Sequence, residues 1–365
     1  MDHFHTVANL RAHAHEIYPG KIHHESSIMK EQVGGKSDSK IPMLTIQPNY
    51  ILKPLQSDHR GLREMIFYEM VTSVKQILEF FNHGQTNAKQ HKWITRFKLG
   101  FEWIVFQLYG NLIDRKWYKD ISHLYQLSEF IPDYHGVVHD NIHNAINAIT
   151  DKNAPSRNPH QYIILTDETL PFNNPCIMDL KIGTITYEPD AKSSKKESQR
   201  KKYPQQEEFG FRIVGMKVYD PYHPEACKST GYRSIDKFGG RQLTTHHSII
   251  YAIASFFTFN GSTSEKGDKT QSMQRYVIED FLKKLIRLRK WFVENESFAF
   301  YASSLLLIYE GAPTIPDQTS TTYTTTLKMI DFAHVRKCRG NDVGYLHGLD
   351  VIISILNYIY NPMNE

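Results

Sequence analysis

Residues 175–183, PCIMDLKIG, place an aspartate and a lysine two positions apart inside an apolar segment with β-strand character. In a strand, residues two apart share a face, so Asp179 and Lys181 point to one side and the intervening apolar residues to the other. A solvated pair at a sheet edge is worth at most ~1 kcal/mol. A pair in a core or a cleft costs desolvation and is kept mainly where chemistry uses it. Because both flanks are apolar, the strand is predicted to line a functional cleft.

Length and composition narrow the class of protein. The 365 residues suffice for one large two-lobed domain or two ordinary ones. No apolar run reaches the ~20 residues that span a bilayer, and the N-terminus lacks a signal pattern, so no transmembrane segment is expected. The three cysteines lie far apart, which predicts a reducing compartment, cytosolic or nuclear. A net charge of +4 is too mild to imply direct nucleic-acid binding.

The order of the predicted elements is typical of a two-lobed α+β protein with its site between the lobes. Residues 1–30 hold six histidines and predict a mobile N-terminal arm, with a metal site as the alternative. An N-lobe is expected over residues 31–168 and a C-lobe over residues 169–365. Residues 84–128 hold three of the four tryptophans, with lysines and arginines between them. Their helical apolar spacing favours a helical insertion packed on the protein over a nucleic-acid site.

Periodicity predicts the main elements of both lobes. A hairpin is expected over residues 43–55 and an amphipathic helix over residues 59–81. The later strands are expected within residues 161–172, 175–183, 211–220, 298–311 and 327–331. The later helices are expected over residues 192–202, 246–259, 274–295 and 344–360.

A second aspartate, Asp331, ends an apolar strand in the stretch MIDFAHV. Many kinases present a magnesium ligand in this way, although a turn or helix-cap aspartate has the same pattern. Upstream, Lys53 lies in a predicted strand and Glu64 lies eleven residues later on the following helix. A strand lysine held by a helix glutamate orders nucleotide phosphates in kinases. The chain has neither a P-loop nor a G-x-G-x-x-G motif.

Residues 192–202, KSSKKESQRKK, hold six basic residues and one acid. In a helix, Lys195, Ser198, Gln199 and Lys202 share one face. Such a face suits a multiply phosphorylated, hydroxyl-rich ligand. A solvated helix face and a nuclear-import signal fit the composition equally well. The position directly after the Asp179 strand favours the substrate interpretation.

Together these residues resemble the signature of the inositol phosphate kinase family, P-x-x-x-D-x-K-x-G, which reads here Pro175, Asp179, Lys181 and Gly183. The small Gly183 also leaves room for a ligand. The surrounding sequence is most similar to the multikinase branch of that family, and the similarity runs from Glu31 to the C-terminus. The matching stretches are NPCIMDLKIGTITYEP, KYPQQEEFGFRIVGMKVYD, FYASSLLLIYEG, MIDFAHV and GYLHGLDVIISIL.

The resemblance implies a two-lobed fold similar to protein kinases and ATP-grasp enzymes, with ATP and Mg²⁺ in the cleft between the lobes. It implies that Asp179 and Lys181 are catalytic and that Asp331 is the metal ligand. The residues that it places around ATP are Lys53, Glu64, Asp167, Glu168 and Asp331, with Asp167 and Glu168 forming an interlobe hinge. The residues that it places around the inositol phosphate are Lys195, Ser198, Gln199, Lys202, Lys217 and His334.

The implied activity is ATP-dependent phosphorylation of inositol trisphosphate to tetrakis- and pentakisphosphate, in the nucleus and cytoplasm. The multikinase branch also phosphorylates phosphatidylinositol 4,5-bisphosphate at the 3-position, which implies contact with a membrane surface. Two alternatives stay open: a sister-group kinase (a trisphosphate 3-kinase or a hexakisphosphate kinase), and a non-catalytic scaffold that binds polyanions. A scaffold predicts an erased catalytic set, whereas this sequence keeps it.

Three features depart from the family pattern. Ser198 stands where the multikinase branch has glutamine, and Thr166 stands where an acidic residue is usual at the hinge. The tryptophan-rich segment is longer than the family needs. None of these departures changes Asp179, Lys181 or Asp331.

Overall fold

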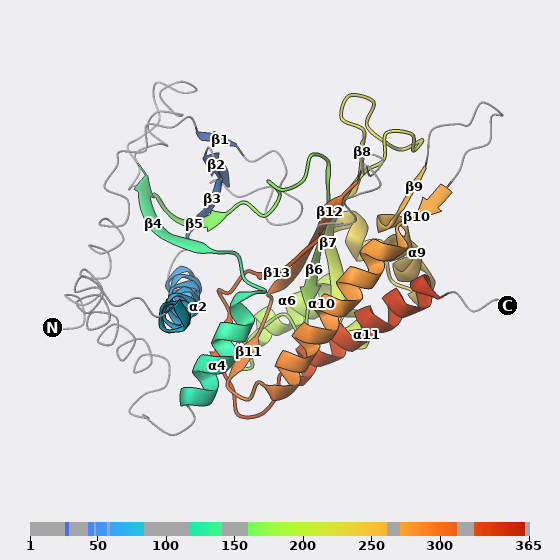
Figure 1. Ribbon diagram of the computed structural model, residues 1–365. Coiled ribbons are helices and arrows are strands. Elements are labelled where there is room, and N and C mark those ends of the chain that lie inside the picture. Colours follow the sequence, from blue (N-terminus) through green and yellow to red (C-terminus); the bar gives the residue numbers. More distant parts are fainter. Residues whose placement is uncertain are drawn as a thin grey trace, which may run out of the picture.

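The computed structural model describes residues 26–28, 43–46, 49–56, 59–83, 117–140, 160–260, 271–311 and 325–361. Most of the histidine-rich arm and residues 84–116 of the tryptophan-rich segment lie outside these residues. Two five-stranded antiparallel sheets, joined through residues 167–174, form the framework (Figure 1). The expected α+β class is confirmed.

The first sheet has the strand order β1-β2-β3-β5-β4. Its strands are β1 (Ser26–Ile28), β2 (Leu44–Ile46), β3 (Tyr50–Pro54), β4 (Tyr134–Asp140) and β5 (His160–Thr166). Strands β2 and β3 pair antiparallel, as the predicted hairpin requires. The long helix α2 (His59–His83) follows β3, and α4 (Trp117–Ser128) precedes β4.

The second sheet has the order β13-β12-β6-β7-β8. Its strands are β6 (Pro175–Ile182), β7 (Phe211–Tyr219), β8 (Tyr232–Ile235), β12 (Ser304–Glu310) and β13 (Thr325–Ile330). The segment PCIMDLKI is therefore the central strand, β6. Its Cys176, Met178, Leu180 and Ile182 belong to the main core. The predicted alternation of the two faces is confirmed.

Helices α9 (His246–Phe256), α10 (Arg275–Glu294) and α11 (Val343–Tyr360) cover the core face of this sheet (Figure 1). The prediction that the first of these helices extends to residue 259 is wrong. The helix ends at Phe256 because β9 (Thr258–Asn260) pairs antiparallel with β10 (Gln271–Met273). Once these backbone groups bond across a hairpin, they are not available to continue a helix.

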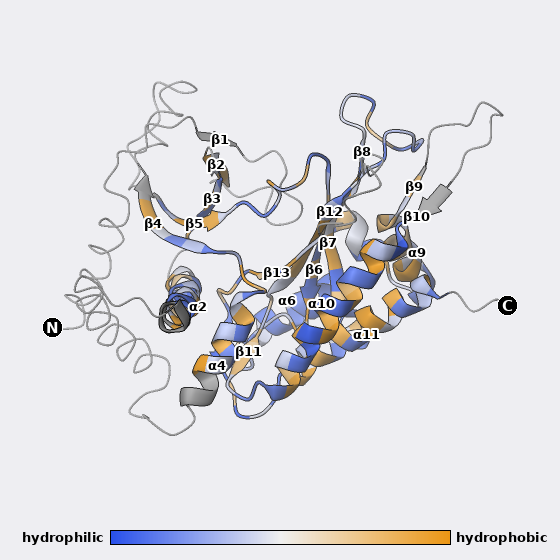
Figure 2. Cartoon of the chain, viewed as in Figure 1, coloured by the Kyte–Doolittle hydropathy of each residue, from blue (hydrophilic) through white to orange (hydrophobic). Residues whose placement is uncertain are grey.

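The remaining elements are short or peripheral. They are α6 (Ser193–Lys202), α7 (Gln206–Phe209), α8 (Lys237–Gln242), β11 (Phe298–Phe300) and β14 (Val335–Lys337). Strand β11 pairs with β14. The basic stretch forms the predicted helix, α6, and hydrophilic residues make up its whole surface (Figure 2).

Helices of the first part of the chain pack into the core of the second part. Phe67 of α2 lies 5.6 Å from Phe300 and 4.6 Å from Phe332 between ring centroids. Trp291 of α10 donates its Nε1–H to the carbonyl of His123 in α4, at 2.7 Å. The two sheets are therefore joined by one continuous hydrophobic core. A lobe boundary at residue 168 stays a prediction.

Among the described residues, one helix, α11, is long and apolar enough to cross a membrane by length and composition. It lies along α10 and buries Tyr345, Leu349, Ile352 and Leu356. In this fold it therefore serves as a core helix.

Candidate active site

The face of the second sheet that points away from the covering helices carries the charges of the signature. Asp179 is paired in register with Leu306 and Gly215, and Lys181 with Ser304 and Arg212. Register partners in antiparallel strands share a face, so this face carries Asp179 and Lys181 near its centre. Beside them, Phe172, Ile177 and Ile308 form a small separate apolar cluster.

Asp179 is almost fully buried, with 4% of the residue exposed, and its Oδ1 has no hydrogen-bond partner among the described residues. Burial raises the pKa of Asp179 to about 6, although the positive charge of Lys181 partly opposes the shift. A carboxylate with an unused oxygen and a pKa near neutrality suits proton transfer.

Lys181 is held by the turn between β11 and β12. Its Nζ donates to the carbonyl oxygen of Ala302 at 2.6 Å. Burial lowers the pKa of Lys181, and the carboxylates of Asp331 and Asp179 partly offset this. Ala302 has a φ of 55°, which is uncommon for a residue with a Cβ. The sequence predicts only strand structure within residues 298–311, and nothing in it indicates that the Ala302 carbonyl meets Lys181.

The predicted pair of Lys53 and Glu64 forms, with Lys53 Nζ 2.6 Å from Glu64 Oε1. Lys53 also donates to Asp331, a contact that joins the first sheet to the end of β13. Burial alone would lower the pKa of Lys53, but the carboxylates of Asp331 and Glu64 outweigh it and raise that pKa well above its ordinary value. Lys53 is therefore charged at neutral pH.

Asp331 follows β13 and has a φ of 67°, and 35% of its side chain is exposed. Burial acts to raise the pKa of Asp331, but the positive charges of Lys53 and Lys181 outweigh it, so this pKa is lowered. The described residues include no cluster of three or more His, Cys, Asp or Glu that could hold a metal ion. Mg²⁺ usually takes one or two protein carboxylates and completes its shell with water and phosphate oxygens. An ionised, partly exposed Asp331 fits that requirement.

Asp167 and Glu168 begin the connection between the sheets, as expected of a hinge. The N–H of Asp167 donates to Asn49 O at 3.0 Å, and the Asp167 carboxylate accepts from the N–H of Thr169 at 2.9 Å. Glu168 Oε1 lies 3.6 Å from Lys328 Nζ. The Asp167 N–H is thus already used inside the protein. The hydroxyl of Thr166 bonds His135 Nε2 at 2.8 Å.

The four residues predicted to share one face of helix α6 differ in their exposure to solvent. Lys195 and Gln199 are half-buried, and Thr186 Oγ1 donates to Gln199 Oε1 at 3.5 Å. Ser198 and Lys202 are exposed and help to line an open hollow of about 370 Å³. The other flank anchors the helix, since Lys196 donates to Pro189 O at 2.6 Å.

The two remaining predicted substrate residues lie on different elements. Lys217 of β7 is paired with Ile177, and its Nζ lies 4.0 Å from the ring centroid of Tyr232 on β8. His334 lies in the turn after β13, where its Nδ1 is 3.2 Å from Glu188 Oε1. The structure brings His334 to the loop that precedes α6, and places Lys217 beside β8.

Gly183 has a backbone role that its place in the signature does not reveal. Its φ is +106°, and its N–H donates to Gly210 O at 2.8 Å. Only glycine adopts this φ readily. The tight bend at the end of β6 therefore requires Gly183, whether or not a ligand comes close.

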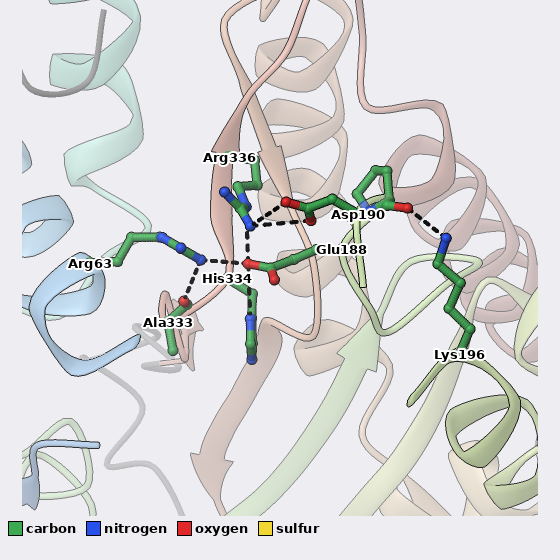
Figure 3. A network of polar contacts seen from close by, with 8 residues as sticks. Arg63, Glu188, Asp190, Lys196, Ala333, His334 and Arg336 are labelled. Carbon is green, nitrogen blue, oxygen red and sulfur yellow. Dashed lines mark hydrogen bonds and ion pairs between the residues drawn. The ribbon is translucent and has the colours of Figure 1, made fainter. Parts of the chain in front are cut away.

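Sequence reasoning missed a cluster of charged residues around Glu188, whose carboxylate contacts Arg63, His334 and Arg336 (Figure 3). The stretch TYEPD places an acid after the signature strand. It gives no local sign that the partners of this acid lie 125 and 148 residues away along the chain.

Comparisons with known proteins point to one family. The family described as inositol polyphosphate kinase matches residues 162–357. Inositol polyphosphate multikinase of Homo sapiens is 34% identical over 287 residues, an alignment that covers 78% of this chain and 51% of that protein. Inositol hexakisphosphate kinase 2 of Homo sapiens is 29% identical over 252 residues, covering 59% of this chain and 55% of that protein. The chain thus spans about half the length of the curated relatives it matches.

Among solved structures, the inositol phosphate multikinase Ipk2 of S. cerevisiae, in complex with ADP and Mn²⁺, is 24% identical with a TM-score of 0.48. That alignment covers 63% of this chain and 89% of the other. The family match extends over more than half of the chain and includes β6, α6, β12 and β13. The chain belongs to the inositol polyphosphate kinase family.

Proposed function

We propose that this protein is an ATP-dependent kinase that phosphorylates inositol trisphosphate to tetrakis- and pentakisphosphate. The observation that carries the proposal is the convergence of Asp179, Lys181, Lys53 and Asp331 around one cleft face. Phosphoryl transfer needs a carboxylate at the attacking hydroxyl and cations at the transferred group. The similarity to a protein named inositol polyphosphate multikinase supports this choice of substrate.

In this proposal Asp179 accepts the proton of the ring hydroxyl as the oxygen attacks the γ-phosphorus of ATP, while the bond from that phosphorus to the β,γ-bridging oxygen breaks and ADP leaves. Its buried Oδ1 has no partner among the described residues that would compete for that proton. Lys181, fixed by the Ala302 carbonyl, stabilises charge on the transferred group. Lys53, held by Glu64, binds ATP phosphates. Asp331 would hold Mg²⁺, which when bound neutralises charge on phosphate oxygens.

The inositol phosphate would contact α6 and its surroundings. The proposed contacts are Lys195, Ser198, Gln199, Lys202, Lys217 and His334. Several of these residues are cations, which suits a ligand whose phosphates carry multiple negative charges. Adenine would lie by the hinge residues Asp167 and Glu168, next to the apolar cluster that contains Phe172 and Ile177. Because the Asp167 N–H already bonds Asn49, we expect the neighbouring backbone groups to recognise adenine.

Helix α6 also supports two secondary proposals. It has no buried residue and carries exposed cations. Exposed cations are what a protein needs to bind phosphatidylinositol 4,5-bisphosphate at a membrane surface. The same Lys/Arg-rich composition suits nuclear import, so we propose a nuclear and cytoplasmic location. A membrane-bound substrate and an import receptor would compete for this helix.

A hexakisphosphate kinase is the second candidate, because hexakisphosphate kinases are also similar to this chain. The exposed Ser198, shorter than the glutamine of the multikinase pattern, would leave room for an additional phosphate.

The test is a kinase assay with purified protein and its Asp179→Asn variant. Each is incubated with Mg-ATP and inositol 1,4,5-trisphosphate, inositol hexakisphosphate or phosphatidylinositol 4,5-bisphosphate, and the products are separated by charge. We expect stepwise conversion of the trisphosphate to tetrakis- and pentakisphosphate, reduced at least ~1,000-fold in the variant. Chelation of the metal should stop turnover. Turnover of hexakisphosphate alone would favour the second candidate, and no turnover of any substrate would favour a scaffold.

A further inference from the structure

The carboxylate of Glu188 contacts two arginines, Arg63 and Arg336, and the ring of His334 (Figure 3). Its Oε1 accepts hydrogen bonds from Arg63 Nη1 and, at 3.0 Å, from Arg336 Nε, and it lies 3.2 Å from His334 Nδ1. Only 11% of the Glu188 side chain is exposed. Burial alone would raise the pKa of Glu188, but the hydrogen bond from Arg336 and the adjacent ring of His334 outweigh it and lower this pKa to about 2. Glu188 is therefore ionised whenever the protein is folded near neutral pH.

The partners of Glu188 come from α2, from the turn between β13 and β14, and from β14. Arg63 precedes Glu64 on α2 and also donates to Ala333 O at 3.2 Å. His334 follows in the same turn, three residues after Asp331. Glu188 itself lies in the loop that leads from β6 to α6. One carboxylate thus ties the loop before α6 to α2 and to the β13–β14 turn.

His334 has a specific geometry in this cluster. Because Nδ1 faces Glu188, the ring cannot flip without losing this partner, and Nε2 points away from the carboxylate. Burial, together with the positive charges of Lys195 and Arg63, lowers the pKa of His334, and Glu188 partly opposes this shift. An anionic group near Lys195 would therefore meet a histidine whose orientation is already set. A ring held at Nδ1 by a carboxylate donates a hydrogen bond to a phosphate through Nε2 when both nitrogens carry a proton, a state that the negative charges of Glu188 and of the phosphate favour.

We infer that Glu188 is a positioning residue, which orients His334 to bind a phosphate group of the inositol substrate. This inference rests on the proposed function. It predicts that Glu188 affects the binding of the inositol phosphate and does not affect the binding of ATP. Glu188 does not touch the substrate and acts through the ring that it holds.

The experiment measures KM and kcat for inositol 1,4,5-trisphosphate, and KM for ATP, in the unmutated protein and in Glu188→Gln. We expect the KM for the trisphosphate to rise about tenfold, with kcat within about threefold and the KM for ATP unchanged. The matched control is Asp190→Asn. Asp190 accepts from the same Arg336 at 3.1 Å, but its side chain is 69% exposed, so the kinetics of the Asp190→Asn variant should stay unchanged.

A double-mutant cycle shows whether Glu188 acts through His334. In a His334→Ala background, Glu188→Gln should raise the KM for the trisphosphate less than about twofold further, because the ring it positions is gone. Independent effects that multiply, or a rise in the KM for ATP, would overturn the inference. If circular dichroism shows that Glu188→Gln does not fold, the same kinetic measurements are made on Glu188→Asp. This variant keeps the negative charge on a shorter side chain.

The unmutated protein separates this inference from the proposed function. If it does not phosphorylate the trisphosphate, the proposed function fails. If it does, and Glu188→Gln has an unchanged KM for the trisphosphate, only the role of Glu188 is rejected.

Discussion

Asp179 occupies a position that costs stability at neutral pH. Burial raises its pKa in the folded protein to about 6 from an ordinary value of 3.8. The folded state therefore favours the protonated acid. The contribution of Asp179 to the free energy of unfolding is greatest below pH ~4 and is lost as the pH rises through ~6. At neutral pH the protein keeps a buried, ionised carboxylate because the proposed chemistry needs a proton acceptor there.

Asp179→Asn should therefore stabilise the protein while abolishing turnover. At pH 7.5 we expect the free energy of unfolding to rise by about 1–3 kcal/mol, because the amide removes a buried charge. At pH 5 the gain should fall by about half, because the unmutated carboxyl is then largely protonated in the folded state. Urea denaturation at both pH values checks this. An equal gain at both would mean that the charge of Asp179 is not the cause.

At the scale of elements, a contact between two glycines anchors the end of β6. The carbonyl of Gly210, at the C-terminal end of α7, accepts the N–H of Gly183 at 2.8 Å. Gly210 also lies against α11, where a Cβ added to Gly348 would be 2.3 Å from Gly210 O. Helix α11 can approach so closely only because residue 348 has no side chain. The packing of α11 on Gly210 therefore helps to fix the backbone at the bend that follows Lys181.

Gly348→Ala should disturb both stability and activity. The added methyl group must push Gly210 away, which we expect to cost about 2–3 kcal/mol of unfolding free energy. Turnover should fall at a temperature where the variant is still folded, because the Gly183 bend moves. The control is Gly340→Ala. Gly340 has a φ of +98° but nothing within 4 Å of an added Cβ. Its alanine variant should lose about 1 kcal/mol and keep full activity; equal activity in both variants would refute the coupling.

At the scale of the whole molecule, the two lobes are not independent bodies. Phe67 of α2 packs on aromatic rings of β11 and of the segment after β13. The N–H of Met329 donates to Phe130 O at 2.6 Å, so the chain after α4 extends the hydrogen bonding of the second sheet. Polar contacts between the two parts of the chain, such as that of Lys53 with Asp331, also hold the two sheets together.

A fragment that spans residues 169–365 should consequently fail to fold cooperatively. Without α2 and α4 it exposes the face around Phe298, Phe300 and Trp291. Loss of the Phe67 ring alone is worth about 3–5 kcal/mol, a large share of the about 5–15 kcal/mol that stabilises a typical protein. We expect weak near-ultraviolet circular dichroism and strong binding of a hydrophobic dye, compared with the full chain. A sharp unfolding transition of the fragment would show that the C-lobe is autonomous.

Local patterns in the sequence predicted much of this structure. The alternation in β6 assigned its two faces, and the helical spacing of residues 192–202 gave α6. The pair of Lys53 and Glu64 formed as expected, since Glu64 lies eleven positions after Lys53, on the helix that follows its strand. The spacing also brought Asp179 and Lys181 to the same face of the second sheet, as expected. Each of these inferences used contacts that the backbone geometry of one or two elements dictates.

By itself the sequence determined the order of elements, the faces of the strands and the family signature, because periodicity and motif spacing are local properties. Only the tertiary structure decided that Asp331 meets Lys53 across 278 residues, and that Glu188 joins Arg63 to His334. It alone placed the Ala302 carbonyl on Lys181, 121 residues away. The physical reason is that a buried charge is stable only beside a partner of opposite charge or a hydrogen-bonding group. The residue type shows that such a partner is needed, whereas tertiary packing determines which distant residue it is.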